Sequence, residues 1–248
     1  KSEIAGRKYK FLNNFDLIKR KCLKFIYKYA NEKSFLLEKL DKNKKTIFSN
    51  SYLNQKYNNT IFFEGYFESE NYFKEFKNDL IEEFSFKSFP NLKNNIFKKI
   101  INDSNVVSIA LRRRRYTEIV GEDLDNKKVK KSEDFENLTI EYIYRAIEYF
   151  KSHVENPKFL VWSDNFENLE NHFDPNKFIF VKNDVKEKIF LDFFLMRQCK
   201  YFIVGPTSFH WWAAWLCNKD DKIIVRPKDN ELNQSSNADF WPKSWIKI

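Results

Sequence analysis

The second half of this chain predicts an α/β fold built around a parallel sheet. Two observations support that class. Short apolar segments alternate there with longer segments of helical periodicity, and each apolar segment is followed by polar or turn-forming residues. Strands that alternate with helices favour a parallel sheet whose two faces are both covered. Ligands of such sheets bind beyond the carboxyl ends of the strands, so we expect the functional residues there.

The expected elements follow one another in a regular order from about residue 105. Short continuous apolar runs predict buried strands, whereas apolar residues at helical spacing predict helices. On this basis we expect strands at residues 106–111, 159–162, 178–181, 201–204 and 223–225. We expect helices at residues 139–154, 187–199 and 209–217, and a charged loop at residues 123–131.

The first hundred residues have a different character. They are rich in Phe, Tyr and Lys, and they carry helical patches at residues 17–30 and 72–84. We therefore expect two lobes, one formed by residues 1–102 and the other by residues 103–248.

Composition limits the classes of protein to which the chain can belong. Hydrophobic residues make up 42% of its 248 residues, which is enough to bury a substantial core. No apolar run approaches the roughly 18–20 residues that a membrane span requires. No secretory signal pattern opens the chain, and its three cysteines have neither metal-ligand spacing nor an even count for disulfides. A cytoplasmic location is the simplest expectation.

The formal net charge of +9 suits three kinds of partner: nucleic acid, an anionic membrane surface or a nucleotide-sugar. Scattered lysines account for much of the excess, and they are also typical of an ordinary solvated surface. Charge alone therefore leaves the partner open.

A strand, a tight turn and the start of a helix are expected within residues 201–216, YFIVGPTSFHWWAAWL. Such a turn presents backbone N–H groups and the positive end of the helix dipole to an anion. Thr207 and Ser208 would lie at the helix entrance, where hydroxyls cap the helix or bind a phosphate. An ordinary capped core helix explains the same segment equally well. His210 follows, and a lone histidine is more often a packed or capping residue than a catalyst.

Four consecutive arginines, residues 112–115, directly follow the first expected strand. Guanidinium groups bind phosphate bidentately and keep their charge, so arginines and a helix N-terminus can stabilise a departing diphosphate without a metal. Strand alternation places Arg112 and Arg114 opposite Arg113 and Arg115. A solvated basic turn and a nucleic-acid patch are the alternatives.

Ser163, Asp164 and Asn165 end the next expected strand. A carboxylate or amide there could accept hydrogen bonds from guanine N1 and N2, and a capping turn for a helix at residues 166–171 is the alternative. Residues 123–125, Asp-Leu-Asp, formally match a metal motif but lie in the charged loop, so we expect no metal site. Asp192 lies on an otherwise apolar helix, which suggests a buried role.

Four segments in order resemble glycosyltransferase family 11, the bacterial α-1,2-fucosyltransferase group. Residues 65–73, GYFESENYF, resemble the family's GYFQSEKYF, and residues 107–116, VSIALRRRRY, resemble its VSIHIRRGDY. Residues 192–199, DFFLMRQC, are similar to its D-x-x-L-M-x-x-C helix, and the segment around the Trp pair is similar to its NSSFSWWAAWL. Four ordered matches are far more specific than any one of them.

The resemblance implies a GT-B-like α/β fold with two Rossmann-type lobes. The family's opening glycine-rich motif has no counterpart here, so we expect the N-terminal lobe to be incomplete, with residues 1–102 as the remainder of the acceptor side and residues 103–248 as the donor lobe. The implied reaction is an inverting, metal-independent transfer of L-fucose or a related sugar from a GDP-sugar to a galactoside hydroxyl. The acceptor would be an oligosaccharide or lipid-linked glycan of a surface polysaccharide or lipopolysaccharide. No cofactor and no nucleic acid are implied, and a basic face would suit peripheral association with the inner membrane.

Site residues follow from the same resemblance. Arg112 and Arg113 match the two arginines of the family motif HxRRxD, the first of which would bind the donor β-phosphate, and Ser163, Asp164 and Asn165 match SDD. The donor contacts would be completed by Thr207, Ser208, Phe209 and His210. The catalytic base is expected among Glu118, Glu122 and Asp123, which follow the arginines.

The chain departs from the family pattern at three positions of that motif. The family His is Ala110 here, the Gly is Arg114 and the Asp is Arg115. A family member with a changed donor, or without activity, is therefore the first rival hypothesis. A basic nucleic-acid-binding protein built around the arginines is the second.

Overall fold

The computed structural model describes residues 18–19, 21–22, 25–26, 35–52, 62–85, 95–117, 126–183, 188–229, 231–232 and 238–248. The chain divides into two compact units. The first contains residues 1–5, 84–234 and 243–248, and the second contains residues 6–83 and 235–242. The helical patch expected at residues 17–30 lies mostly outside the described residues.

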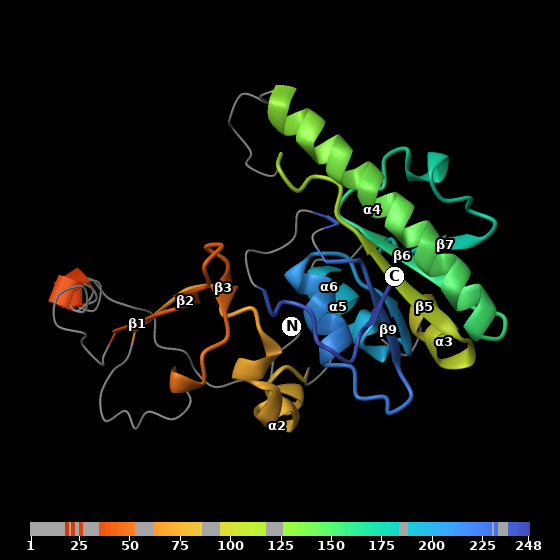
Figure 1. Ribbon diagram of the computed structural model, residues 1–248. Helices are drawn as coiled ribbons and strands as arrows, with labels where there is room; N and C mark the ends of the chain where they lie inside the picture. The colour runs from red at the N-terminus through yellow and green to blue at the C-terminus, as the bar shows by residue number, and fades with distance from the viewer. Residues whose placement is uncertain are drawn as a thin grey trace. The chain divides into compact units, whose positions relative to one another are not determined.

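A six-stranded parallel sheet is the centre of the first unit (Figure 1). Its strand order is β10-β9-β8-β5-β6-β7. The strands are β5 (Val106–Leu111), β6 (Lys158–Ser163), β7 (Phe178–Phe180), β8 (Tyr201–Ile203), β9 (Ile223–Arg226) and β10 (Ile246–Lys247). The predicted α/β class and the five predicted strands are confirmed. Strand β10 was not predicted, because its two exposed residues carry no apolar run.

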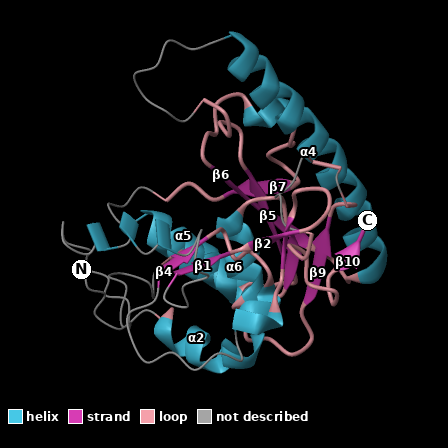
Figure 2. Ribbon diagram, turned by 60° about the vertical axis from the view of Figure 1, so that its left-hand side comes forward, coloured by secondary structure: helices cyan, strands magenta, loops and turns pink. Residues whose placement is uncertain are grey.

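Helices cover both faces of this sheet (Figure 2). The long helix α4 (Asn126–His153) packs on one face, and α5 (Lys188–Gln198) and α6 (Ser208–Trp215) pack together on the other. Helix α3 (Ile96–Asp103) contacts α5. From β5 the chain passes through α4 to β6 and then β7, and it returns through α5 to β8 on the opposite side of β5. The order of the strands therefore reverses between β5 and β8, which is where such sheets form a ligand crevice.

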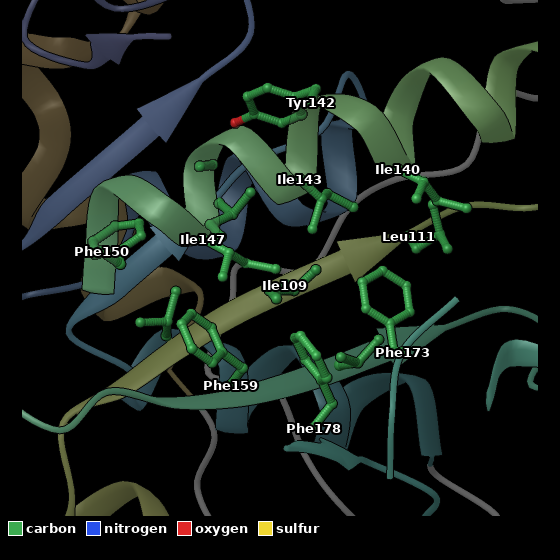
Figure 3. Close-up of a cluster of buried hydrophobic side chains, with 14 of the residues drawn as sticks. Ile109, Leu111, Ile140, Tyr142, Ile143, Ile147, Phe150, Phe159, Phe173 and Phe178 are labelled. Atoms are coloured by element: carbon green, nitrogen blue, oxygen red, sulfur yellow. The ribbon is translucent and has the colours of Figure 1, made fainter. Parts of the chain in front are cut away.

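The main hydrophobic core lies between α4 and the sheet (Figure 3). Ile143, Ile147 and Phe150 recur at helical spacing on the buried face of α4, and they pack with Ile109 and Leu111 of β5. Burying each such side chain contributes about 1.5–3 kcal/mol. The core thus holds β5, and the arginines that follow it, in a rigid frame.

Tyr142 adds a polar link between α4 and two neighbouring strands. Its hydroxyl lies 3.1 Å from the carbonyl oxygen of Val204 and 2.9 Å from that of Val225, so its single proton is shared between them. Burial raises the pKa of Tyr142 well above its ordinary value, which keeps the hydroxyl protonated as a donor.

Two sequence predictions were wrong in this unit. The stretch 126–131, expected as part of a charged loop, forms the first turns of α4. Lysine and glutamate are good helix formers, and Val129, Ser132 and Phe135 continue the inward-facing spacing, so the helix extends through the charged segment. The helix expected at residues 166–171 is only a 3-10 turn, Leu169–Asn171, because Asn168 adopts a left-handed conformation with φ of 54°.

The second unit contains two small sheets. Strands β1 (Phe35–Leu37) and β4 (Phe62–Glu64) pair in parallel, and β2 (Lys39–Leu40) and β3 (Thr46–Ile47) pair antiparallel. The helical patch expected at residues 72–84 is confirmed in part as α2 (Lys77–Glu83), preceded by 3-10 turns at Glu70–Tyr72 and Lys74–Phe76. A further 3-10 turn spans Asn50–Tyr52.

The GYFESENYF segment begins at a glycine that the fold requires. Gly65 has φ of 156°, and a Cβ there would lie 2.4 Å from Cβ of Glu38. The Glu38 carboxylate accepts hydrogen bonds from the backbone N–H groups of Tyr66 (2.8 Å) and Phe67 (3.0 Å). Only glycine leaves room for this buried carboxylate to hold the turn.

No helix in the described ranges combines the length and the apolarity that crossing a bilayer requires.

Candidate functional site

A cavity of about 410 Å³ opens at the carboxyl edge of the parallel sheet, within the first unit. Its walls come from the ends of β5 and β6, from one side of α5 and from the first turn of α6. The lining residues are Ala110, Leu111, Arg112, Trp162, Ser163, Asp164, Lys188, Ile189, Asp192, Met196, Thr207 and Phe209. The position agrees with the expected crevice beside the strand-order reversal.

Arg112 is the arginine that lines the cavity. Ile109 and Leu111 of β5 face α4, so alternation along the strand turns Ala110 and Arg112 to the opposite side, where the cavity lies. A guanidinium at this position can bind an anionic group of a ligand through two parallel hydrogen bonds.

Arg113 and Arg115 lie on the α4 side instead. Arg113 Nε donates to Glu136 Oε1 at 2.6 Å, and its Nη1 donates to the carbonyl oxygens of Asn165 and Glu167. Arg115 stacks its guanidinium 4.7 Å from the Phe135 ring centre and donates to the Pro206 carbonyl oxygen. The predicted alternation of the arginines therefore holds for these residues. The structure does not bring Arg113 to the cavity, although the sequence suggested a donor contact.

Asp164 both lines the cavity and holds the turn after β5. Its Oδ1 accepts a hydrogen bond from the backbone N–H of Arg113 at 2.8 Å, and its Oδ2 accepts one from Arg114 at 3.2 Å. Asp164 thereby fixes the backbone that carries Arg112.

The residues on either side of Asp164 form a local turn. The Ser163 hydroxyl donates to the Asn165 carbonyl oxygen at 2.8 Å, and Asn165 Oδ1 accepts from the backbone N–H of Glu167 at 3.1 Å. Ser163 still lines the cavity, whereas Asn165 lies outside the lining and its side chain only closes the local turn before Glu167.

The helix entrance after β8 lies on the opposite wall. Thr207 is the N-cap of α6, yet its side chain makes no capping hydrogen bond, so the hydroxyl is available to a ligand. Phe209 lines the cavity beside it, and Ser208 is exposed to solvent outside the lining. The first N–H groups of α6 have no partners within the helix and carry the positive end of its dipole.

His210 is buried and does not reach the cavity wall, so the expected donor contact is not supported by its position. Its Nε2 lies 3.0 Å from the Ser108 hydroxyl of β5, and its Nδ1 has no partner among the described residues. Burial lowers the pKa of His210 to about 3, so the ring is neutral at physiological pH. It is a packed histidine that joins α6 to the sheet.

Asp192 brings a carboxylate to the cavity from α5. Its Oδ1 accepts a hydrogen bond from Asn183 Nδ2 at 2.6 Å, and Lys188 lies on the same wall. Burial raises the pKa of Asp192 to about 6, against the lowering effects of Asn183 and Lys188. The lone acid on an apolar helix was the sequence signal for it, whereas nothing in the local sequence pointed to Lys188 or Trp162.

The profile of glycosyl transferase family 11 matches residues 17–248. The chain belongs to glycosyltransferase family 11. That confirms the resemblance drawn from the four ordered segments.

Three relatives illustrate the similarity. An α-1,2-colitosyltransferase of Escherichia coli is 29% identical over 79% of this chain and 65% of its own length. The O-antigen biosynthesis glycosyltransferase WbnK of Escherichia coli is 30% identical over 62% of this chain and 48% of its own length. A galactoside α-(1,2)-fucosyltransferase 1 of Ateles belzebuth is 30% identical over 34% of this chain and 24% of its own length.

The chain thus spans less than two thirds of the length of these curated relatives. No solved structure matches it significantly.

The three candidate bases of this family 11 chain, Glu118, Glu122 and Asp123, lie outside the described residues, as do the two aspartates of the Asp-Leu-Asp motif. In the part of the chain that the structure describes, no three His, Cys, Asp or Glu side chains gather in a group that could hold a metal ion.

Proposed function

We propose that this protein is an inverting, metal-independent glycosyltransferase that moves L-fucose or a related sugar from a GDP-sugar to a galactoside hydroxyl. One observation carries the proposal. In a family 11 chain, Arg112 and the N-terminal end of α6 line one cavity at the strand-order reversal of a parallel sheet. A guanidinium and a helix N-terminus are suited to a diphosphate.

In the proposed reaction, the acceptor oxygen attacks the anomeric carbon while the bond from that carbon to the diphosphate oxygen breaks. GDP leaves with the electron pair, and the configuration of the sugar is inverted. Arg112, the Thr207 hydroxyl and the first N–H groups of α6 take up the developing negative charge. A base among Glu118, Glu122 and Asp123 receives the acceptor proton.

The proposal assigns residues 103–248 to the donor lobe and residues 1–102 to the remainder of an acceptor lobe, in a GT-B-like arrangement. The names of the relatives support the chemistry, since two are named for α-1,2 transfer of a colitosyl or fucosyl group and one for O-antigen biosynthesis. An oligosaccharide or lipid-linked glycan of the cell surface is the proposed acceptor, reached from the inner face of the membrane.

A changed donor sugar is the second candidate, and Ala110 favours it. Ala110 lines the cavity with a methyl group where the family resemblance places an imidazole. The nucleic-acid alternative is less well supported, because the four arginines do not form one surface. Of the four, only Arg114 is exposed, while Arg113 and Arg115 are engaged on the α4 side.

Calorimetric titration of the full-length protein with GDP, and with UDP as the control, tests the proposal. We expect saturable binding of GDP and at least tenfold weaker binding of UDP, since the cavity would select a purine base. An acceptor screen with GDP-fucose then identifies the sugar transferred. If neither GDP nor UDP binds, the assignment of the donor site is wrong, and so is the proposed enzyme activity.

The affinity for GDP is expected to rise as the pH increases through about 6. Asp192 has a pKa raised to about 6, so it is protonated below that pH and ionised above it. The ionised carboxylate accepts hydrogen bonds from N–H groups of the base, and the protonated form accepts them poorly. Titrations between pH 5 and pH 8 measure the change.

Asp192→Asn is the matched control for this pH dependence. It keeps the side-chain shape but cannot titrate, so any dependence that remains belongs to the nucleotide's own phosphate. Identical pH profiles for the wild type and the variant would show that Asp192 does not contact the ligand.

A further inference from the structure

A buried hydrogen-bond donor in the cavity wall has no acceptor among the residues that the structure describes. Trp162 is 2% exposed, it lines the cavity, and its indole Nε1 has no hydrogen-bond partner among the described residues. Among the described residues, three other buried side-chain atoms also have no hydrogen-bond partner. They are Thr46 Oγ1, His210 Nδ1 and Arg226 Nε, and none of those residues lines the cavity. Buried polar groups are normally paired, so an unpaired donor beside a cavity indicates a partner that the ligand supplies.

The strand register explains how so large a side chain fits here. Trp162 of β6 lies directly opposite Ala110 of β5, and both belong to the cavity wall. Phe159 and Val161 of β6 face the α4 core, so alternation turns Trp162 to the cavity side. The small Ala110 side chain leaves space beside it for an indole ring. The two residues therefore form a small–large pair on one wall.

The remaining contacts suggest which part of a ligand lies against this wall. Ile189, Met196 and Phe209 are apolar, which suits the plane of an aromatic base better than a phosphate. Arg112 and the helix entrance at Thr207 suit the diphosphate. A base whose edge carries an acceptor would satisfy the indole N–H.

We propose that Trp162 is a ligand-binding and specificity-determining residue whose indole N–H donates a hydrogen bond to the 6-carbonyl oxygen of a purine base. The inference rests on the proposed GDP-sugar function and deepens it. A 6-oxopurine presents an acceptor at that position. Adenine presents an amino donor there, so it would leave the indole N–H unpaired and would be rejected.

Trp162→Phe tests this assignment, because it removes the N–H and keeps an aromatic ring. We expect the affinity for GDP and for inosine diphosphate, measured by calorimetry, to fall by about tenfold, since loss of one partner leaves the buried carbonyl oxygen unpaired. The weak binding of ADP is expected to change less than twofold. Trp215→Phe is the matched control, since Trp215 is equally buried but lies outside the cavity lining. Thermal melting establishes that both variants are folded.

A spectroscopic measurement on the wild type does not depend on how the variant folds. The indole ¹⁵N–¹H resonance of Trp162 is expected to move downfield when GDP binds and to stay in place with ADP. Inorganic pyrophosphate is the further probe, and an equal shift with it would assign the N–H to phosphate and overturn the base contact.

The outcomes separate this inference from the function on which it rests. If the wild type binds GDP while Trp162→Phe binds it equally well and the resonance does not move, Trp162 is not a ligand contact and the proposed function stands. If the wild type binds neither GDP nor inosine diphosphate, both proposals are wrong.

Discussion

Arg112→Ala is expected to lower the affinity for GDP, and the rate of sugar transfer, by about 100-fold. Arg112 lines the cavity, and its guanidinium would make charge-assisted hydrogen bonds to the diphosphate that strengthen as the leaving group gains charge. Calorimetry measures the loss in affinity, and initial rates with a GDP-sugar measure the loss in turnover.

Arg114→Ala is the matched control for this variant. It removes the same charge two positions along the chain from a side chain that is exposed to solvent. We expect less than a twofold effect on GDP binding, because a long-range charge effect is screened by salt. Equal losses in the two variants would show that the arginines act through net charge alone, contrary to a specific site at Arg112.

The neighbouring substitution, Arg113→Ala, is expected to lower the free energy of unfolding by about 3 kcal/mol. The side chains of Arg113 and Glu136 are only 14% and 12% exposed, and their 2.6 Å ion pair joins the turn after β5 to α4. Removing the guanidinium takes the close charge partner away from the buried Glu136 carboxylate, which keeps the weaker contact with His172 Nε2 at 3.9 Å, and it takes a donor away from two carbonyl oxygens. Urea denaturation followed by circular dichroism measures the difference.

A double variant and a GDP-binding measurement test whether Arg113 acts through stability alone. In the double variant Arg113→Ala/Glu136→Gln, no uncompensated charge is buried, so part of the lost stability is expected to return. The Arg113→Ala protein that remains folded is expected to retain most of its affinity for GDP. Abolished GDP binding at unchanged stability would instead support the donor contact that the sequence suggested for Arg113.

The contrast between these adjacent arginines shows how far the sequence predicts the site. Period-two alternation was enough to place Arg112 and Arg113 on opposite faces of the β5 extension, and the short apolar runs were enough to locate five strands of the parallel sheet. Which of the two faces holds a cavity was not predictable, because that depends on the helices that cover it. Glu136, the ion-pair partner of Arg113, lies on α4. The sequence predicted that helix only from residue 139, because the many charged residues before it suggested a loop.

The sequence by itself determined the α/β class, the strand ends that carry Arg112, Ser163 and Thr207, and the family. All of these can be predicted from local hydrophobic periodicity and from motifs in a fixed order. The tertiary structure decided which side chains meet. It buried His210 against Ser108, brought Asp192 to the cavity and left the indole N–H of Trp162 without an acceptor in the described part of the chain. These outcomes depend on β8 lying beside β5 and on α5 and α6 sharing one face, which are non-local pairings that no short stretch of sequence specifies.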